Sequence, residues 1–365
     1  MPDWEGVRLH VVSGKGGTGK TTVAAALAMA LAAEGRRTLL IEVEERQGIA
    51  ELFGISALPY EERKVASVAP GALGKRGTPG PGGKGPGPGG KGAAGRGEGE
   101  VFALAIDIEQ ALLEYLEMFY KLGRAGKALR KVGFIDFATT IAPGLRDVLL
   151  TGKACEAVRR KGPDGRRLYD AVVMDAPPTG RVSRFLNINT EVAGLARFGP
   201  IFTQSQAVMR VIRSPETVVH LVTLLEEMPV QETVDGVTDL RAAGLPVGGV
   251  IVNMVRPPVL DEAAVLAAEG DHTEELALAL ADAGVGARPG RGSSRKSVPA
   301  ATRKLVEPLL AQGREHAARV LLEREQRADV QALDLPTYEL PLLAGGVDLG
   351  GLYRLAAALK EQGAA

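Results

Sequence analysis

A glycine-rich run near the start of the chain constrains the fold more than any other feature. Residues 13–22 read Ser-Gly-Lys-Gly-Gly-Thr-Gly-Lys-Thr-Thr, and Gly14, Gly19, Lys20 and Thr21 meet the pattern G-x-x-x-x-G-K-[ST]. Glycines leave backbone N–H groups free to converge on phosphate oxygens, while the lysine faces the β- and γ-phosphates and the threonine hydroxyl faces Mg²⁺. The run therefore predicts a phosphate-binding loop.

The residues on both sides of this loop supply the context that the motif needs. Residues 9–12, Leu-His-Val-Val, are typical of a short buried strand. Residues 22–34 are mostly strong helix formers and end before Gly35. The order strand, loop, helix places the helix N-terminus where a phosphate binds.

The rest of the chain alternates strands with helices, as a parallel sheet covered on both faces requires. We expect further strands at five apolar runs: 37–43, 101–106, 169–175, 248–253 and 337–341. A helix over 351–361 closes the chain. The pattern predicts an α/β fold, a doubly wound and mostly parallel sheet of the P-loop NTPase type, forming a single domain over residues 1–365.

Four segments do not fit a plain alternation. Residues 108–160 and 191–228 carry apolar residues at three- and four-residue spacing, which predicts an inserted helical subdomain. Its apolar face is either packed core or an exposed groove for an apolar client. Residues 70–100 are rich in Gly, Pro and Lys and predict a disordered basic insertion, either solvated or a tether to an acidic surface. Residues 287–297 predict a second, shorter flexible loop.

Composition excludes several classes of function. The chain has 44 basic and 44 acidic side chains, so it offers no general argument for nucleic acid as a partner. Cys155 is the one cysteine, which excludes an intramolecular disulfide framework or a multi-thiolate zinc site within one chain and favours a buried structural thiol. No apolar run reaches the length of about 18 residues that spans a bilayer, and no leader pattern is found, so we expect a cytoplasmic protein.

Two acids are candidates for the chemistry at the phosphates. Asp175 ends an apolar strand, where its carboxylate can hold Mg²⁺ through water, and the Ala-Pro-Pro-Thr-Gly turn over 176–180 could respond to the γ-phosphate. After the second strand come three carboxylates at 42, 44 and 45, any of which could orient a water molecule. The spacing favours Glu44.

Lys15 is a lysine more than the general loop pattern requires. It stands at the tip of the loop beside Gly16 and Gly17, so we expect its ammonium group to point away from its own nucleotide. A neighbouring subunit is best placed to use it.

Several spaced motifs resemble one known family. Residues 15–21, Lys-Gly-Gly-Thr-Gly-Lys-Thr, resemble the deviant Walker A motif of the SIMIBI class of P-loop NTPases. Residues 175–186, Asp-Ala-Pro-Pro-Thr-Gly-Arg-Val-Ser-Arg-Phe-Leu, resemble the second signature of the ArsA-type ATPases, the family of the arsenite-pump ATPase and of targeting factors for tail-anchored membrane proteins. The similarity extends to 214–217, 232–233 and 252–253, and so covers nearly all of the chain outside the two insertions.

The resemblance implies roles for individual residues. Contacts to the phosphates would come from Gly14, Gly16, Gly17, Thr18, Gly19, Lys20, Thr21 and Thr22, and Mg²⁺ would be held by Thr21 and Asp175. Lys15 would reach the partner's nucleotide, and the side-chain amide of Asn253 would recognise adenine. The family fold implies ATP-driven opening and closing of a homodimer, or of a heterodimer with a paralogous ATPase. Movement of the helical subdomain would then handle a client, with a membrane-associated client left open.

The chain departs from the family pattern at three points. Glu44-Glu45-Arg46-Gln47 stands where these ATPases usually carry Asp-Pro-Ala-His. The longer glutamate can misplace an attacking water by about 1 Å and cost roughly 100-fold in rate, so slow hydrolysis is expected. Arg181 replaces a histidine of the second signature, and clustered thiolates are missing, so neither arsenite nor zinc binding is expected.

Two other functions stay open. A slow or inactive nucleotide-dependent regulatory or scaffold subunit, paired with a paralogous chain, is favoured by Glu44 and Arg181. A positioning ATPase that coats membrane or DNA would need a basic or amphipathic binding face, and the C-terminal helix over 352–360 is short and only mildly basic.

Overall fold

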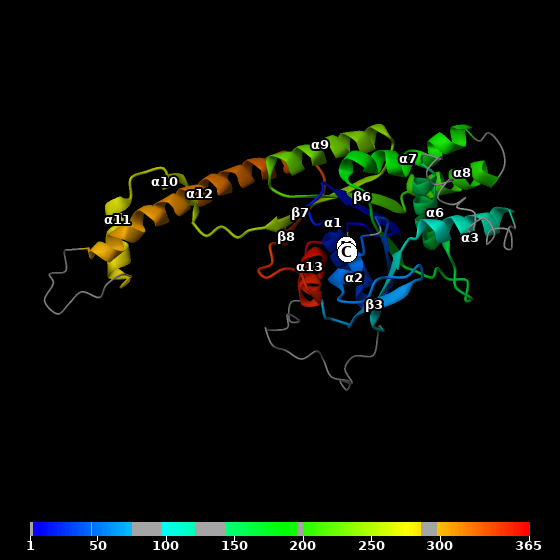
Figure 1. Ribbon diagram of the computed structural model, residues 1–365, viewed down its shortest axis with the longest axis horizontal. Coiled ribbons are helices and arrows are strands. Elements are labelled where there is room, and N and C mark those ends of the chain that lie inside the picture. Colours follow the sequence, from blue (N-terminus) through cyan, green and yellow to red (C-terminus); the bar gives the residue numbers. More distant parts are fainter. Residues whose placement is uncertain (1–2, 45, 75–96, 121–143, 196–199, 286–297) are drawn as a thin grey trace. The chain divides into compact units, whose positions relative to one another are not determined.

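An eight-stranded sheet forms the centre of the molecule (Figure 1). The computed structural model describes residues 3–44, 46–74, 97–120, 144–195, 200–285 and 298–365. The strand order is β3-β4-β2-β5-β1-β6-β7-β8, and every neighbouring pair is parallel except β3 with β4. The strands are β1 (Leu9–Gly14), β2 (Arg37–Glu42), β3 (Arg63–Val68), β4 (Gly99–Ala105), β5 (Ala171–Asp175), β6 (Thr217–Thr223), β7 (Val247–Val255) and β8 (Thr337–Pro341).

Helices cover both faces of this sheet, which confirms the doubly wound α/β fold (Figure 1). One face carries α1 (Lys20–Ala32), followed by the 3₁₀ turn η1 (Ala33–Gly35), with α2 (Gly48–Leu52) and α13 (Leu349–Glu361). The other face carries α3 (Ile108–Tyr120), α6 (Leu145–Arg159), α7 (Thr179–Leu195), α8 (Pro200–Ile212) and α9 (Glu227–Ala242).

Alternation along the central strands explains the two layers. Leu39 and Ile41 of β2 belong to the core under α6 and α7, whereas Leu40 belongs to the core under α1. Because successive side chains of a strand point to opposite faces, a run of three apolar residues buries both faces. Helix α1 is buried over residues 23–32, since its alanines and leucines pack between the sheet and α13.

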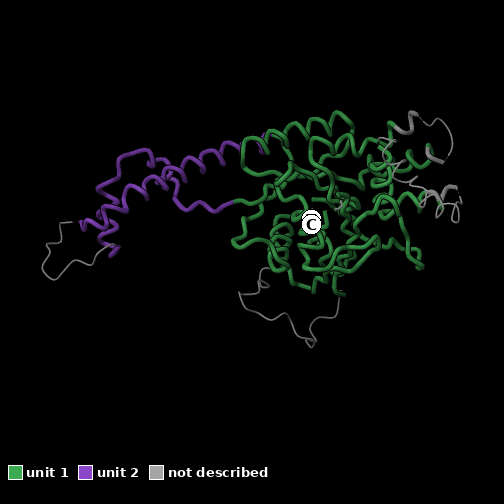
Figure 2. Tube along the Cα trace, in the orientation of Figure 1, with its two compact units in different colours: residues 1–255, 333–365 green, residues 256–332 purple. Residues whose placement is uncertain are grey.

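The described residues divide into two compact units (Figure 2). The first unit, residues 1–255 and 333–365, contains the sheet. The second, residues 256–332, contains α10 (Glu262–Ala267), α11 (Thr273–Asp282) and α12 (Ala300–Gln331), and a small cluster of Val265, Ala317 and Val320 holds it together. The prediction was a single domain over 1–365, whereas the described residues form two compact units, and within the second unit α10 and α11 pack on α12.

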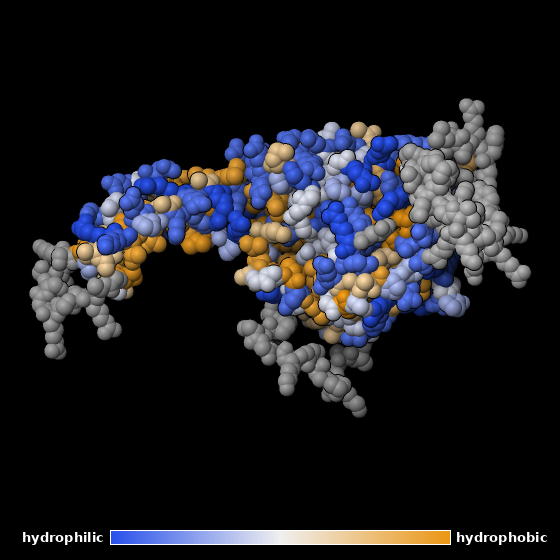
Figure 3. Space-filling view, in the orientation of Figure 1, coloured by the Kyte–Doolittle hydropathy of each residue, from blue (hydrophilic) through white to orange (hydrophobic). Residues whose placement is uncertain are grey.

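The second unit leaves large apolar side chains in contact with solvent. Val259, Leu266 and Leu278 have exposed fractions of 82%, 68% and 50%, and hydrophobic surface is visible on this unit in Figure 3.

The structure also changes some predicted boundaries. Residues 217–223 lie inside the segment 191–228 expected to be helical, but they form the central strand β6, because Thr-Val-Val-His-Leu-Val-Thr is dominated by β-branched residues. Residues 99–105 form β4, so the Gly/Pro/Lys insertion ends earlier than the predicted 70–100. Residues 75–96 of that insertion, residues 121–143 of the helical subdomain and the predicted loop 287–297 lie outside the described residues.

Two histidines are buried between β1 and β6. His10 and His220 stack with ring centroids 5.4 Å apart and Nδ1 of His10 lies 3.1 Å from Nε2 of His220, while Trp4 contacts His220 edge-on. Both rings are at most 1% exposed. Burial lowers the pKa of His10 well below its usual value and lowers the pKa of His220 to about 3. Both rings are therefore neutral in the folded protein near neutral pH.

This pair predicts a loss of stability in mild acid. An unfolded histidine has a pKa near 6.5, so below that pH the unfolded state binds protons that the folded state does not bind. The contribution of the two histidines to the free energy of unfolding is complete above about pH 6.5 and is lost progressively as the pH falls toward the pKa of the folded state. We expect the Tm to fall as the pH is lowered from 6.5 to 5. In His220→Phe, the slope of Tm against pH in this window should be about half that of the wild type.

Thermal unfolding followed by circular dichroism measures this effect. The exposed His272 is a comparison of opposite sign: its hydrogen bonds to Glu275 and to the carbonyl of Ala267 raise its pKa, so His272→Gln should make the fall of Tm between pH 6.5 and 5 slightly steeper, not shallower. A Tm independent of pH in this window for the wild-type chain would contradict the prediction.

Candidate nucleotide site

A pocket of about 330 Å³ lies at the carboxyl ends of β2 and β5 and at the N-terminus of α1. It brings together seven of the residues that the sequence predicted: Gly17, Gly19, Lys20, Thr21, Thr22, Glu44 and Asp175. Parallel strands deliver their carboxyl ends to one edge of the sheet, which is where α/β proteins usually bind ligands. Gly14, Lys15, Gly16, Thr18 and Asn253 do not line this pocket.

The glycines at the two ends of the loop are needed for its path. A Cβ on Gly14 would collide with the carbonyl oxygen of Val222. Gly19 has φ +83°, which other residues rarely adopt, and a Cβ there would lie 2.5 Å from the amide nitrogen of Asn253. The loop therefore rests tightly on β6 and β7, and α1 begins at Lys20 with its first N–H groups at the pocket.

Asp175 is the buried acid of the pocket. The hydroxyl of Thr21 donates a 2.7 Å hydrogen bond to its Oδ2, whereas Oδ1 is buried without a hydrogen-bond partner. Burial raises the pKa of Asp175 to about 6, and the nearby acids Glu42 and Glu44 add to the rise while Lys20 opposes it. An acid in these surroundings is stabilised by a cation.

Glu42 also lines this pocket; it is one of the three candidate carboxylates of the sequence, but the spacing favoured Glu44 over it. It ends β2 directly beside Asp175 in the parallel register, and only 2% of it is exposed. Its Oε1 accepts a 3.0 Å hydrogen bond from the backbone N–H of Gly48, its Oε2 is buried without a partner, and burial raises its pKa. Its place as the last residue of an apolar strand that neighbours Asp175 was the available signal.

The donor set fits Mg²⁺. That ion prefers oxygen ligands and is usually held by one or two carboxylates together with phosphate oxygens and water. Thr21 and Asp175 supply a hydroxyl and a carboxylate, and the orphaned Oδ1 of Asp175 and Oε2 of Glu42 are oxygens that lack a donor. Bound Mg²⁺ would supply charge neutralisation at the β- and γ-phosphates.

Side chains outside the pocket hold the loop in place. Ser13, the first residue of the glycine-rich run, donates a 2.6 Å hydrogen bond to the carbonyl of Pro177, which links the loop to the turn after Asp175. The hydroxyl of Thr18 donates to the carbonyl of Lys15 at 2.9 Å. The amide nitrogen of Asn253, which is 5% exposed, donates to the carbonyl of Thr18 at 2.9 Å. Asn253 therefore contacts the loop itself.

Lys15 lies on the outside of the loop. Its Nζ is 3.7 Å from Oε2 of Glu232 on α9, and both side chains are 30% exposed. The ammonium group thus pairs within its own subunit in this structure, and its role toward a second nucleotide stays a prediction.

The loop that follows β2, called the acid loop below, contains Glu44 and Arg46, and these two side chains contact each other. Arg46 approaches Glu44 with its Nε 3.7 Å from Oε2, and Arg46 also lines the pocket. Arg181, at the start of α7, lies with Nη2 3.7 Å from Oδ1 of Asp147 on α6. Glu44 therefore lines the pocket with a cation beside it.

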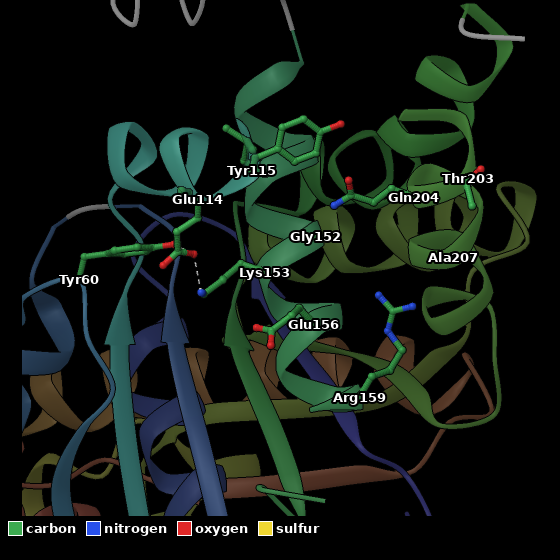
Figure 4. A pocket seen from close by; sticks show the side chains of 12 residues that line it. Tyr60, Glu114, Tyr115, Gly152, Lys153, Glu156, Arg159, Thr203, Gln204 and Ala207 are labelled. Carbon is green, nitrogen blue, oxygen red and sulfur yellow. Dashed lines mark hydrogen bonds and ion pairs between the residues drawn. The ribbon is translucent and has the colours of Figure 1, made fainter. Parts of the chain in front are cut away.

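A second cavity, of about 660 Å³, lies among the helices on the opposite face of the sheet from α1 (Figure 4). Its walls come from α3, α6 and α8, with Tyr60 at one side. Glu114 accepts hydrogen bonds from Lys153 at 2.8 Å and from Tyr60 at 2.9 Å, and Arg159 of α6 lies on the other side (Figure 4). Charged groups line this cavity, so it differs from the purely apolar groove considered from the sequence.

Two further features bear on the sequence predictions. Cys155 is fully buried and burial raises the pKa of its thiol to about 12, which confirms an unreactive structural cysteine. No helix among the described residues has the length and apolar character to cross a membrane.

Comparison with known proteins agrees with this geometry. Residues 9–273 match the CobQ/CobB/MinD/ParA nucleotide binding domain. The chain is 46% identical over 360 residues to the ATPase BagA of Mycobacterium tuberculosis, covering 98% of this chain and 94% of that protein. It is 24% identical over 177 residues to the "Putative arsenical pump-driving ATPase 2" of Aquifex aeolicus, covering 48% of this chain and 46% of that protein.

A eukaryotic protein extends the same similarity. The chain is 24% identical over 206 residues to the ATPase get3 of Schizosaccharomyces japonicus, covering 54% of this chain and 51% of that protein. The nucleotide pocket, the sheet order and these matches agree with the motifs at 15–21 and 175–186. The chain belongs to the CobQ/CobB/MinD/ParA nucleotide-binding family of P-loop proteins and, within it, to the ArsA-type ATPases.

Proposed function

We propose that this chain binds ATP with Mg²⁺ and hydrolyses ATP to ADP and orthophosphate. The observation that carries this proposal is the meeting of Lys20, Thr21, Glu44 and Asp175 in one pocket at the N-terminus of α1. A lysine and helix N–H groups suit phosphates, the hydroxyl and buried carboxylate suit Mg²⁺, and a second carboxylate can orient water.

The proposed reaction is a transfer of the γ-phosphoryl group to water. The water oxygen forms a bond to the γ-phosphorus, the bond from that phosphorus to the β–γ bridging oxygen breaks, and ADP leaves with that electron pair. The products are ADP, orthophosphate and a proton, which passes to solvent. Lys20 stabilises the charge on the phosphate oxygens, and Glu44 accepts a hydrogen bond from the attacking water.

A single-turnover experiment tests this proposal. The chain is mixed in excess with radiolabelled ATP and Mg²⁺, and labelled phosphate is counted after acid quenching. Asp175→Asn is expected to lower the rate about 100-fold, because the amide cannot supply the charge that the cation needs. An unchanged rate in Asp175→Asn would exclude this pocket as the site of hydrolysis.

We further propose that two subunits complete each other's sites through Lys15. The exposure of Lys15 at the loop tip supports this role, and the pairing with Glu232 is no obstacle to it. Half-exposed ion pairs with atoms 3.7 Å apart contribute about 1 kcal/mol or less, so Lys15 can exchange Glu232 for a phosphate of a second nucleotide at small cost. The second subunit is either an identical chain or a paralogous ATPase.

The contact of Asn253 makes a prediction about nucleotide choice. Because its amide donates to the Thr18 carbonyl behind the loop, Asn253→Ala leaves that carbonyl without its donor and frees space beside Gly19. We expect the affinity for ATP and for GTP to fall about 10-fold alike, the cost of one lost buried hydrogen bond. Calorimetric titration with both nucleotides checks this.

The outcome separates the two roles of Asn253. A variant that loses affinity for ATP while its affinity for GTP stays at the wild-type value would show that this amide reads adenine. Thr238→Ala is a matched control, since its hydroxyl bonds only within α9 and it should leave both affinities unchanged.

A slow regulatory or scaffold subunit is the second candidate function. The ion pair between Arg46 and Glu44 favours it, because a cation beside the carboxylate weakens its attraction for a water proton. In this case Arg46→Ala should raise the single-turnover rate several-fold. A wild-type rate constant of several per second would rule the scaffold role out, since a slow subunit cannot show it.

We also propose that the nucleotide cycle moves the helices around the second cavity and thereby handles a client. The turn after Asp175 leads directly into α7, which packs on α6 and α8 of the cavity wall. Hydrogen exchange of α6 and α8 with ATP and with ADP tests the coupling. Equal exchange in both nucleotide states would contradict it.

A further inference from the structure

A small polar pocket of about 270 Å³ adjoins the nucleotide pocket. The two pockets share Glu44 and Arg46, so they are continuous on the side of the acid loop. The remaining charged groups of the small pocket are Arg146 and Asp147 in the first turn of α6 and Arg181 in the first turn of α7.

Three guanidinium groups dominate the charge of this pocket. Arg46, Arg146 and Arg181 face two carboxylates, Glu44 and Asp147, so the lining residues that the structure describes carry one net positive charge. The ion pairs between them are long, 3.7 Å for both Arg46 with Glu44 and Arg181 with Asp147, and Arg46 and Arg181 are 76% and 62% exposed. Pairs of this kind are weak, so their guanidinium groups can turn to a stronger anion.

The placement of Arg146 strengthens the preference for an anion. Its Nη2 lies 3.5 Å from the carbonyl oxygen of Val43, which directs the guanidinium across the pocket toward the acid loop. Helix α6 has 15 residues and begins beside Gly144, so its positive N-terminal end lies at the same place. A planar guanidinium group binds the oxygens of a phosphate in pairs.

Two of the residues that depart from the family motifs line this pocket. Arg46 and Arg181 stand far apart in the sequence, in the loop after β2 and in the turn after β5, yet both line this one pocket. Each departure adds an arginine to it. A pocket of about 270 Å³ is large enough for a tetrahedral oxyanion with several waters, each of which occupies about 30 Å³ in the liquid, and it is small for a nucleotide.

We propose that this pocket is a phosphate-binding site that holds the orthophosphate released by ATP hydrolysis after it leaves ADP. The inference rests on the proposed hydrolysis, which frees orthophosphate on the side of Glu44, one of the two residues common to both pockets. Arg146 and Arg181 bind the phosphate oxygens beside Glu44. Release of phosphate, rather than cleavage, then sets how long the subunit keeps its ATP-like conformation.

A binding measurement tests the site without any turnover. Radiolabelled orthophosphate is dialysed against the full chain saturated with ADP and Mg²⁺ at constant ionic strength. We expect Arg181→Gln, and the double variant with Arg146→Gln, to weaken phosphate binding at least 10-fold with unchanged affinity for ADP. Arg166→Gln, in an exposed turn, is the matched control and should bind as the wild type does. Equal phosphate binding in the wild type and in Arg181→Gln would overturn the proposal.

A kinetic measurement tests the order of events. Cleavage is followed by acid quenching and phosphate release by a fluorescent phosphate sensor in the same single turnover. In the wild type we expect release to lag behind cleavage, and in Arg181→Gln the lag should shorten at least several-fold while the cleavage rate stays within about twofold. Release that keeps pace with cleavage in the wild type would overturn the role in turnover.

The two measurements separate this proposal from the proposed hydrolysis. If the wild-type chain cleaves no ATP, the hydrolysis proposal fails, and the dialysis alone then decides whether the arginine pocket binds phosphate. Competition by phosphoserine decides the source of the phosphate group. Displacement of orthophosphate by phosphoserine at lower concentration would contradict a site for the hydrolysis product and would indicate a phosphate carried by another molecule.

Discussion

Replacing Lys20 by methionine is expected to lower the rate of ATP hydrolysis about 1000-fold. Lys20 is the first residue of α1 and lines the pocket beside Thr21 and Asp175, so no other lysine of the described pocket can neutralise the γ-phosphate. Methionine keeps the length and the apolar stem of the side chain but removes the charge. The fold should survive, because the side chain is only partly buried at the helix start.

Steady-state phosphate production by purified chains measures this effect. Lys64→Met is the matched control, because Lys64 pairs with Glu100 on the β3–β4 edge, away from the pocket, and should leave the rate unchanged. A Lys20→Met chain that hydrolyses ATP within a few-fold of the wild type would show that the catalytic charge comes from elsewhere. Equal thermal stability of the two variants establishes that the loss is chemical.

Replacing Lys15 by alanine should lower hydrolysis about 100-fold while affinity for ATP changes little. The reason is that Lys15 does not line its own nucleotide pocket, so removing it should spare binding and remove charge only where a second subunit supplies it. This result alone does not separate a lysine acting in trans from one that shapes its own loop through the ion pair with Glu232.

Mixing two inactive variants makes that distinction. Lys15→Ala keeps an intact pocket, and Asp175→Asn keeps an intact Lys15. In a mixed homodimer the Lys15→Ala pocket receives the lysine of the Asp175→Asn subunit and becomes active. Random mixing makes half of the dimers mixed, each with one active site of two, so about a quarter of the wild-type rate should return. No recovery in a sample shown to contain mixed dimers would exclude action in trans.

Local sequence patterns located most strands of the central sheet. The alternation of apolar runs and helix formers located six strands, among them β1, β2 and β5, because burial on both faces of a parallel sheet produces nearly continuous apolar runs. The same patterns failed for β6, whose residues 217–223 follow helical segments and were read as their continuation. Strand β3 was missed because it is an edge strand, exposed at its start and therefore without a long apolar run.

The second unit was missed for a different reason. Residues 256–332 have polar, alanine-rich helices, and the apolar cluster among them is small: Val265, Ala317 and Val320, with Leu260 and Ala268 packed against it. A small core of this kind leaves a weak apolar periodicity in the sequence, and helix propensity by itself does not tell whether a helix joins the main sheet.

The sequence by itself determined the phosphate-binding loop and its fold class. The loop depends on backbone freedom and fixed spacing within ten residues, at Gly14, Gly19, Lys20 and Thr21. Requirements this local can be recognised from the sequence alone. The tertiary structure alone decided which distant groups meet: Glu42 beside Asp175, Asn253 against Thr18, Lys15 against Glu232, and Arg46 with Arg181 in one pocket. Strand order and register set these meetings, and they depend on how all the layers pack together, which no single segment of the sequence specifies.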